Sequence, residues 1–232
     1  MRNSNLILAA ALATLFSTVP GFAQTTDPLA AYSQATLSKD WPGAVAAAQQ
    51  LVNQSPTSAN LNLLAKAQLG SRSADQALAT FERALAAAKA EQPSDISAMA
   101  KWKSGMADIY VGEGNALLML KRTPEAIAAY NNGAQYASKP SLAYFNICAV
   151  SYNNGDMGNA EVACRKCLQA DPTKADAWFI LGSVLFGNSP IDAKGNMTFS
   201  VETKQALNKY LEIAPDGTHA ADVKAMLGMM PK

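Results

Sequence analysis

A recurrence of apolar and small residues every 34 positions constrains this chain more than any other feature of its sequence. Tyr144 and Ile147 return 34 positions later as Trp178 and Leu181, and the same step backwards from Tyr144 meets Tyr110. Within each unit the apolar residues recur at intervals of three and four, which is the period of an α-helix. Because a short break divides each unit, we predict that every unit is a hairpin of two antiparallel helices.

Prolines punctuate this recurrence at the places where one unit gives way to the next. They occur in Pro56-Thr57, Pro93-Ser94, Pro140-Ser141, Pro172-Thr173 and Pro215-Asp216-Gly217-Thr218. Proline disfavours a helical residue before it, and a hydroxyl after it can accept from the open N–H groups of a new helix. The second helices are predicted to begin near residues 42, 74, 124, 157 and 201. No run of alternating β-branched and polar residues indicates a strand, so the predicted class is all-α.

The residues in these slots resemble the tetratricopeptide repeat family. The stretch Trp178 to Leu185 resembles its first-helix signature W-x2-L-G-x2-Y, with Leu185 in the tyrosine slot. Ala126, Tyr130 and Gly133 match its second-helix pattern, as do Ala160, Cys164 and Cys167 before Pro172. The resemblance implies a right-handed superhelical solenoid of antiparallel helix hairpins. It would hold five repeats near 28–57, 58–92, 107–140, 141–174 and 175–217, and a capping helix over 218–230.

Three departures from the repeat have structural consequences. The first unit has a weak first helix and is expected to behave as a terminal unit. About a dozen extra residues precede Trp102, with apolar residues at helical spacing, so the third unit is predicted to begin with a lengthened helix. About nine extra residues over Gly187–Asn196 predict a turn-rich loop between the two helices of the fifth unit.

Residues 1–23 have the pattern of an export signal. Arg2 supplies the positive start, Leu6 to Phe16 is an unbroken apolar run, and Pro20–Ala23 ends in small residues. A membrane anchor is the alternative, but the apolar stretch of about 14 residues is shorter than the roughly 20 that a spanning helix needs. Cleavage after Ala23 is therefore predicted, which leaves a mature chain of 24–232 in the periplasm or secreted.

The charge balance argues against highly charged partners. The chain has 19 Lys and Arg against 18 Asp and Glu, and only 16% of its residues are charged. A chain with a net charge of only +1 has no strong overall field to recruit nucleic acid or anionic lipid. We expect no nucleic-acid partner, and no later segment is apolar for long enough to span a membrane.

The family resemblance implies a binding groove. Stacked hairpins curve so that the first helices form an inner wall, and we predict that the face of these helices not needed for the hairpins binds a protein or peptide segment. The residues on this face are Asn62, Lys66, Asn115, Phe145, Tyr152, Phe179 and Phe186. Amides and aromatics suit an apolar segment, extended or helical, that is held by a few backbone hydrogen bonds. In the alternative interpretation the aromatics pack between units or under the fifth-unit loop. Lys66 stands nearly alone, so the basic carboxylate clamp of some family members is not expected.

The three cysteines raise the possibility of redox or haem chemistry. Cys164 and Cys167 have the spacing of such motifs, but haem attachment needs a histidine where Leu168 stands. Both lie in helix slots that the repeat gives to packing residues, so small buried thiols are the expected role. An oxidising compartment leaves a disulfide open. Cys148 is predicted to face Ala160, about one turn from Cys164, so Cys164 with Cys167 is the pairing we consider.

Residues suited to catalysis form no recognisable constellation. His219 is the one histidine and lies at the start of the terminal helix, while Asp108, Glu113 and Asp192 are interpreted as solvated charges. No phosphate loop follows a strand, and no metal-ligand spacing is present. We therefore expect a non-catalytic scaffold, adaptor or chaperone-like binder without a cofactor. The alternatives are a regulatory subunit of an envelope enzyme or secretion complex, an enzyme with loop-borne chemistry, and a self-assembling structural protein.

Overall fold

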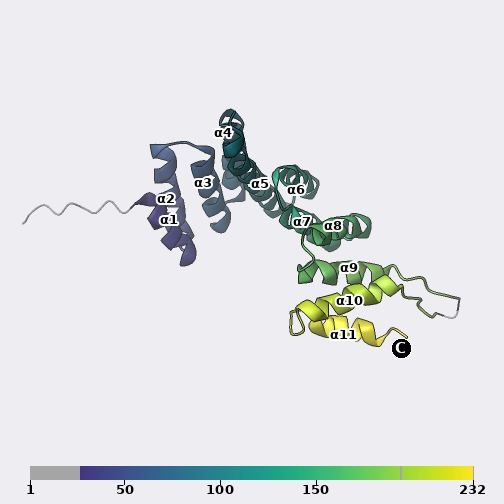
Figure 1. The fold of residues 1–232 in the computed structure, drawn as a ribbon. Coiled ribbons are helices and arrows are strands. Elements are labelled where there is room, and N and C mark those ends of the chain that lie inside the picture. Colours follow the sequence, from purple (N-terminus) through teal and green to yellow (C-terminus); the bar gives the residue numbers. More distant parts are fainter. Residues whose placement is uncertain (1–26, 194, 232) are drawn as a thin grey trace, which may run out of the picture.

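The protein is a curved row of helices (Figure 1). A computed structural model describes residues 27–193 and 195–231, so the predicted signal peptide lies outside the described residues. Eleven helices occur in the part described. They are α1 (Pro28–Leu37), α2 (Trp41–Gln54), α3 (Ser58–Gly70), α4 (Ala74–Ala90), α5 (Ile96–Met119), α6 (Thr123–Tyr136), α7 (Ser141–Asn153), α8 (Met157–Ala170), α9 (Ala175–Gly187), α10 (Val201–Ile213) and α11 (Ala220–Gly228).

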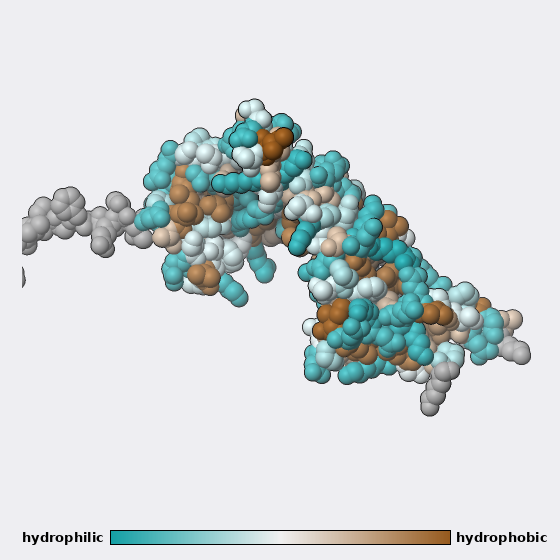
Figure 2. All heavy atoms as spheres, viewed as in Figure 1, coloured by the Kyte–Doolittle hydropathy of each residue, from teal (hydrophilic) through white to brown (hydrophobic). Residues whose placement is uncertain are grey.

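The helices pair in sequence order into five hairpins, followed by α11 at the C-terminal end. Each helix packs against the next along the chain, and in addition α3 contacts α5 and α7 contacts α9. Among the described helices, no second helix makes a comparable contact with the second helix of a neighbouring hairpin. The row therefore bends with the first helices on its inner side, and the arch is open between its two ends in Figure 2. This arrangement confirms the predicted all-α solenoid.

Helix boundaries follow the sequence pattern closely. The second helices begin at Trp41, Ala74, Thr123, Met157 and Val201, within one residue of the predicted starts. The predicted lengthened first helix of the third unit is also present, since α5 has 24 residues whereas α3, α7 and α9 have 13 each. The first unit does contain a first helix, and α1 is the shortest of the five with 10 residues.

Four of the five hairpins share one turn between their helices. Lys39, Arg72, Lys121 and Gly155 occupy the same place in it, and their φ angles of 58°, 60°, 60° and 77° all lie in the left-handed region. In each turn the N–H of the following residue donates to the carbonyl five positions earlier, at 2.8 to 2.9 Å. This bond satisfies a carbonyl at the helix end and reverses the chain within three residues.

The helix caps differ from those expected at the prolines. Thr57 does cap α3, because its hydroxyl accepts from the N–H of Asn60 at 3.3 Å. The other helices that follow a proline are capped by a different residue or have no side-chain cap. Asp95 rather than Ser94 caps α5, and α7, α9 and α11 have no side-chain cap bond. The hydroxyl next to each proline was therefore the wrong residue in four of the five places.

The expectation of buried free thiols is wrong for Cys148 and Cys164, and so is the Cys164–Cys167 pairing that was considered as the alternative. Cys148 on α7 and Cys164 on α8 form a disulfide with their Cα atoms 4.9 Å apart, and Cys167 is a buried free thiol. The prediction placed Cys148 opposite Ala160, but the hairpin is centred close to Asp156, eight residues after Cys148 and eight before Cys164. Both cysteines are fully buried where the two helices approach each other, as small side chains allow.

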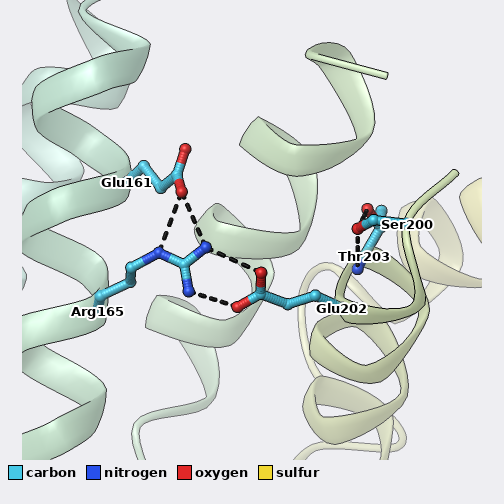
Figure 3. Close-up of polar contacts among 5 residues, drawn as sticks. All are labelled: Glu161, Arg165, Ser200, Glu202 and Thr203. Atoms are coloured by element: carbon cyan, nitrogen blue, oxygen red, sulfur yellow. Dashed lines mark hydrogen bonds and ion pairs between the residues drawn. The ribbon is translucent and has the colours of Figure 1, made fainter. Parts of the chain in front are cut away.

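The C-terminal end is closed by α11, and the last hairpin joins the preceding one through the packing of α9 on α7 and α8 and through an arginine bridge. Leu207 and Tyr210 of α10 pack with Val223 of α11 in a separate apolar cluster. Arg165 on α8 lies between Glu161 and Glu202, which is on α10, and donates to both carboxylates (Figure 3). Arg165 lowers the pKa of Glu202 through this hydrogen bond. None of the described helices has the length and apolar character to cross a bilayer.

Between α9 and α10 the chain forms the predicted loop, which projects beyond the two helices (Figure 1). An isolated antiparallel bridge joins Ile191 to Met197 within it. The loop returns to the body at Ser200, whose hydroxyl caps α10 by accepting from the N–H of Thr203 at 3.0 Å (Figure 3). Phe199, just before this cap, stacks on Phe186 of α9.

Candidate functional site

A hollow of about 530 Å³ lies between α3, the end of α4 and the N-terminal half of α5. It exists because the lengthened α5 continues toward the N-terminal side of Met106, past the level at which the other first helices begin. Since α3 and α5 are both first helices, the hollow opens on the inner side of the arch. Its volume falls within the range of small-ligand and side-chain pockets in proteins.

The floor of the hollow is apolar and held in place. Leu63, Met106 and Ile109 contribute aliphatic surface, and Trp102 contributes an indole ring. The indole N–H donates to the carbonyl of Ala88 at 2.7 Å, so the polar atom of the ring is used inside the protein. The ring also meets Tyr136 edge-on, with centroids 5.8 Å apart. An apolar side chain from a partner would therefore find a preformed surface.

A polar cluster of Asn62, Lys66 and Asp108 borders this floor. Asp108 Oδ2 accepts from Asn62 Nδ2 at 2.7 Å and from Lys66 Nζ at 2.5 Å. Both bonds use the same carboxylate oxygen, which leaves Oδ1 of Asp108 as an open acceptor. Asn62 is 8% exposed, and its Oδ1 is buried without a hydrogen-bond partner. Burial raises the pKa of Tyr32 on α1, and the Asp108 carboxylate adds to that rise.

Of the predicted groove residues, the structure brings Asn62 and Lys66 together in the hollow. Asn115 lies further along α5, where its side-chain oxygen accepts from the Tyr130 hydroxyl at 2.7 Å. This bond gives Asn115 a structural role, since the Tyr130 ring is fully buried. A role of these three residues in partner binding stays a prediction.

The predicted aromatic residues lie on α7 and α9, away from the hollow, and are half-buried. The Lys174 ammonium lies over the Phe145 ring, with Nζ 4.9 Å from the ring centroid. Tyr152 packs against the main core. Phe179 stacks on His219 with centroids 3.8 Å apart, and Phe186 stacks on Phe199 at 4.9 Å. The Phe186–Phe199 contact is compatible with the alternative in which aromatics pack between units or under the fifth-unit loop, and binding by all four residues remains a prediction.

Sequence reasoning missed Asp108 and Trp102 as parts of the site. Asp108 was interpreted as a solvated charge, but it joins α3 to α5 through Lys66 and Asn62. The helical period could have placed Asp108 on the predicted groove face, because it lies seven residues before Asn115 and thus on the same helix face. Trp102 could not be placed from the repeat, since it lies in the extra residues that precede the third unit.

The hollow has the chemistry of binding. It offers an apolar surface, the Lys66–Asp108 ion pair, and the charged side chains of Glu91 and Lys101. Over residues 27–193 and 195–231, no three His, Cys, Asp or Glu side chains gather in a way that could hold a metal ion. His219, which was predicted at the start of the last helix, directly precedes α11, stacks on Phe179 and lies 3.9 Å from an Asp222 carboxylate oxygen.

Similar folds occur among solved structures, while no family model and no curated protein sequence matches this chain. MamA is 19% identical with a TM-score of 0.60, over 79% of this chain and 94% of MamA. YrrB, described as a TPR protein with an unusual peptide-binding site, is 17% identical with a TM-score of 0.56, over 84% of this chain and 88% of YrrB. This chain has the tetratricopeptide repeat fold. PilW, a type IV pilus biogenesis factor, is 16% identical with a TM-score of 0.59, over 85% of this chain and 83% of PilW. These neighbours support the fold.

Proposed function

We propose that this protein is an exported, non-catalytic interaction module that binds a segment of a partner protein on the inner wall formed by its first helices. The hollow between α3 and α5 carries the proposal, because an apolar floor there lies beside polar side chains, the Lys66–Asp108 pair among them. A scaffold, an adaptor and a chaperone-like binder would each use such a surface. The chemistry of any reaction would come from a partner.

Structures with the same fold support a binding role. YrrB is described as having a peptide-binding site, and PilW is described as a pilus biogenesis factor. At 16 to 17% identity they share the architecture with this chain rather than a set of site residues. The proposal therefore depends on the hollow of this protein, and the neighbours make the class of function plausible.

Two independent features support export. The N-terminal sequence has the pattern of a cleavable signal, with a short apolar run and small residues at 21 and 23. The Cys148–Cys164 disulfide is the second, because disulfides persist in oxidising compartments and are rare in the cytosol. The periplasm or the extracellular space is thus the compartment that we propose.

Affinity capture from the envelope fraction of the native host tests this function. The mature protein should retain a protein partner in stoichiometric amount. Ala98 is exposed and lines the hollow, so Ala98→Glu should reduce capture by placing a charge at its edge. Ala100→Glu is the matched control, since Ala100 is also exposed on α5 but does not line the hollow. Recovery of a tightly bound small molecule and no protein would contradict the proposal.

A further inference from the structure

A second hollow, of about 440 Å³, lies at the C-terminal end of the row and is called the C-terminal hollow below. Its walls are the last residues of the projecting loop, the first turns of α10 and the chain after α11, which returns beside the start of α10 (Figure 1). It shares no residue with the hollow between α3 and α5. Its volume lies within the range of small-molecule sites in proteins.

The apolar walls of the C-terminal hollow are held by contacts inside the protein. Phe199 stacks on Phe186 with centroids 4.9 Å apart, and Met230 is only 8% exposed because it packs in the apolar cluster of α10 and α11. Met197 adds to the wall, and Val201, at its edge, is 75% exposed. Methionine side chains are flexible and polarizable, so a wall with two of them can follow the shape of an aliphatic chain.

The opposite side of the C-terminal hollow is a polar face of α10. Lys204, Gln205 and Asn208 lie on this face, since residues four positions apart on a helix are neighbours. Within residues 27–193 and 195–231, the side-chain amides of Gln205 and Asn208 have no hydrogen-bond partner. An ammonium and two amides are thus available as donors. Thr198 and Ser200 are the remaining polar residues that line the hollow.

Lys204 is the one charged residue among the described residues that line the C-terminal hollow. It forms no ion pair with any carboxylate in the described part of the chain, whereas Lys209 on the same helix pairs with Glu212 at 2.8 Å. Glu202, the acidic residue of α10 closest to Lys204 in sequence, accepts instead from Arg165 of α8 (Figure 3). The hollow therefore presents one uncompensated positive charge beside an apolar wall.

This combination selects a ligand with one negative charge and an apolar part. A neutral apolar molecule would cover the wall and leave the ammonium without a partner. An anion with several charges would find a single cation to offset the water that it loses. A single carboxylate can accept from Lys204 and from an adjacent amide, and such charge-assisted hydrogen bonds are about twice as strong as neutral ones.

We propose that the C-terminal hollow binds a monocarboxylate with an aliphatic tail, the chemistry of a medium-chain fatty acid. Its carboxylate accepts from Lys204 Nζ and from the amide of Gln205 or Asn208. Its tail lies against Phe199 and Met230. The site is independent of the proposed interaction function, because it uses the loop and the C-terminal segment rather than the first helices.

The test measures binding of octanoate to the mature protein by isothermal titration calorimetry. Lys204→Gln should weaken binding about tenfold or more, because it removes the cation, and it should leave the thermal midpoint unchanged since Lys204 is exposed. Lys209→Gln is the matched control, with the same loss of charge on the same helix outside the hollow. It should bind octanoate as the wild type does. In methionine methyl NMR spectra, octanoate should shift the signals of Met197 and Met230 and leave that of Met106 in place.

Two further probes separate the charge from the tail. Acetate has the carboxylate without the tail, and 1-octanol has the tail without the charge, so both should bind at least tenfold more weakly than octanoate. Equal affinity for either probe and octanoate, equal octanoate affinities of Lys204→Gln and the wild type, or no measurable binding of octanoate would each overturn the proposal. A variant with three residues added after Lys232 moves the terminal carboxylate of the chain away. If it binds octanoate more tightly than the wild type, the protein's own carboxylate holds Lys204 and the proposed ligand site falls.

Discussion

Cys148 on α7 and Cys164 on α8 are joined by a disulfide that ties the two helices of the fourth hairpin together. The two residues are 16 positions apart in the sequence. A cross-link that closes a loop of this length removes conformational freedom from the unfolded chain, with an expected stabilisation of about 3 kcal/mol. Native protein should therefore contain one disulfide and one free thiol, that of Cys167.

The double variant Cys148→Ala/Cys164→Ala should therefore lose about 3 kcal/mol of unfolding free energy, measured by urea denaturation. Cys167→Ala is the control and should lose less, because Cys167 forms no cross-link. Burial raises the pKa of the Cys167 thiol to about 11, so this thiol should stay unreactive in the folded protein. Three free thiols in denatured, unreduced native protein would contradict the disulfide.

Export makes a prediction about the mature terminus. The protein isolated from the envelope or the medium should begin at Gln24, because cleavage after Ala23 removes Met1 to Ala23. Intact-mass spectrometry measures this directly. A mature mass that retains the first 23 residues would argue against the periplasmic or secreted location.

Much of the fold followed from the period of the sequence. The second helices begin within one residue of their predicted positions, because hairpins that stack in register must repeat the same slots. Ala126 and Ala160 fill such slots and are fully buried. The longer α5 was also predictable, since its apolar residues keep helical spacing through the extra residues.

The hollow could not be predicted in the same way. It depends on how far the extra turns of α5 project beside α3, and no neighbouring repeat supplies a template for that contact. The disulfide failed for a related reason, because the facing residues of a hairpin depend on the crossing of its helices as well as on the turn. Repetition thus predicts which residues are buried, and the departures from repetition create the site.

The repeated turn predicts a gain in stability from glycine. Arg72 has a φ of 60°, a conformation that costs a residue with a side chain about 1 to 2 kcal/mol. Arg72→Gly should raise the unfolding free energy by roughly 0.5 to 1 kcal/mol after the greater freedom of glycine in the unfolded chain is subtracted. Gly155→Ala in the equivalent place should lower it. Thermal unfolding of both variants gives the sign, and a loss in Arg72→Gly would show that its side chain contributes contacts.

Glu113 predicts a pH-dependent effect. Burial raises its pKa, and the nearby Glu82 carboxylate adds to the rise while Lys89 opposes it. A carboxyl whose pKa is higher in the folded state contributes stability at low pH, and the contribution is lost as the pH rises through the folded pKa. Glu113→Gln, which stays neutral, should therefore raise the thermal midpoint at pH 7, and the difference should shrink toward about pH 4.

Glu125 provides the opposite case as a control. Its hydrogen bonds from Arg122 lower its pKa, so its contribution is present at neutral pH and is lost as the pH falls through the folded pKa. Glu125→Gln should leave the thermal midpoint at pH 7 unchanged or lower it. If Glu113→Gln and Glu125→Gln raise the thermal midpoint at pH 7 by the same amount, the burial of Glu113 is not the cause of the rise.

Phe179 decides between a core and a groove role for the aromatic residues of α9. Its ring is parallel to the ring of His219 within 2° and is also 5.9 Å from the Tyr210 ring. Removing the side chain should uncover the cluster that holds α11 to α10. Because Phe179 is half-buried, Phe179→Ala should cost roughly 2 to 3 kcal/mol, less than the 3 to 5 kcal/mol of a fully buried phenylalanine.

The single histidine gives this prediction a direct readout. In the wild type, the His219 ring protons lie over the Phe179 face, so their NMR signals should be shifted upfield and should return to ordinary positions in Phe179→Ala. Trp178→Ala is the comparison for stability, because Trp178 is half-buried on the same helix and donates to the Pro172 carbonyl at 2.8 Å. Similar losses in both variants, with the histidine signals moved only in Phe179→Ala, would assign Phe179 to the packing of the C-terminal end. An unchanged melting curve and unchanged histidine signals in Phe179→Ala would mean that the ring is free to contact a partner, and the groove would then extend from the hollow at α5 to α9.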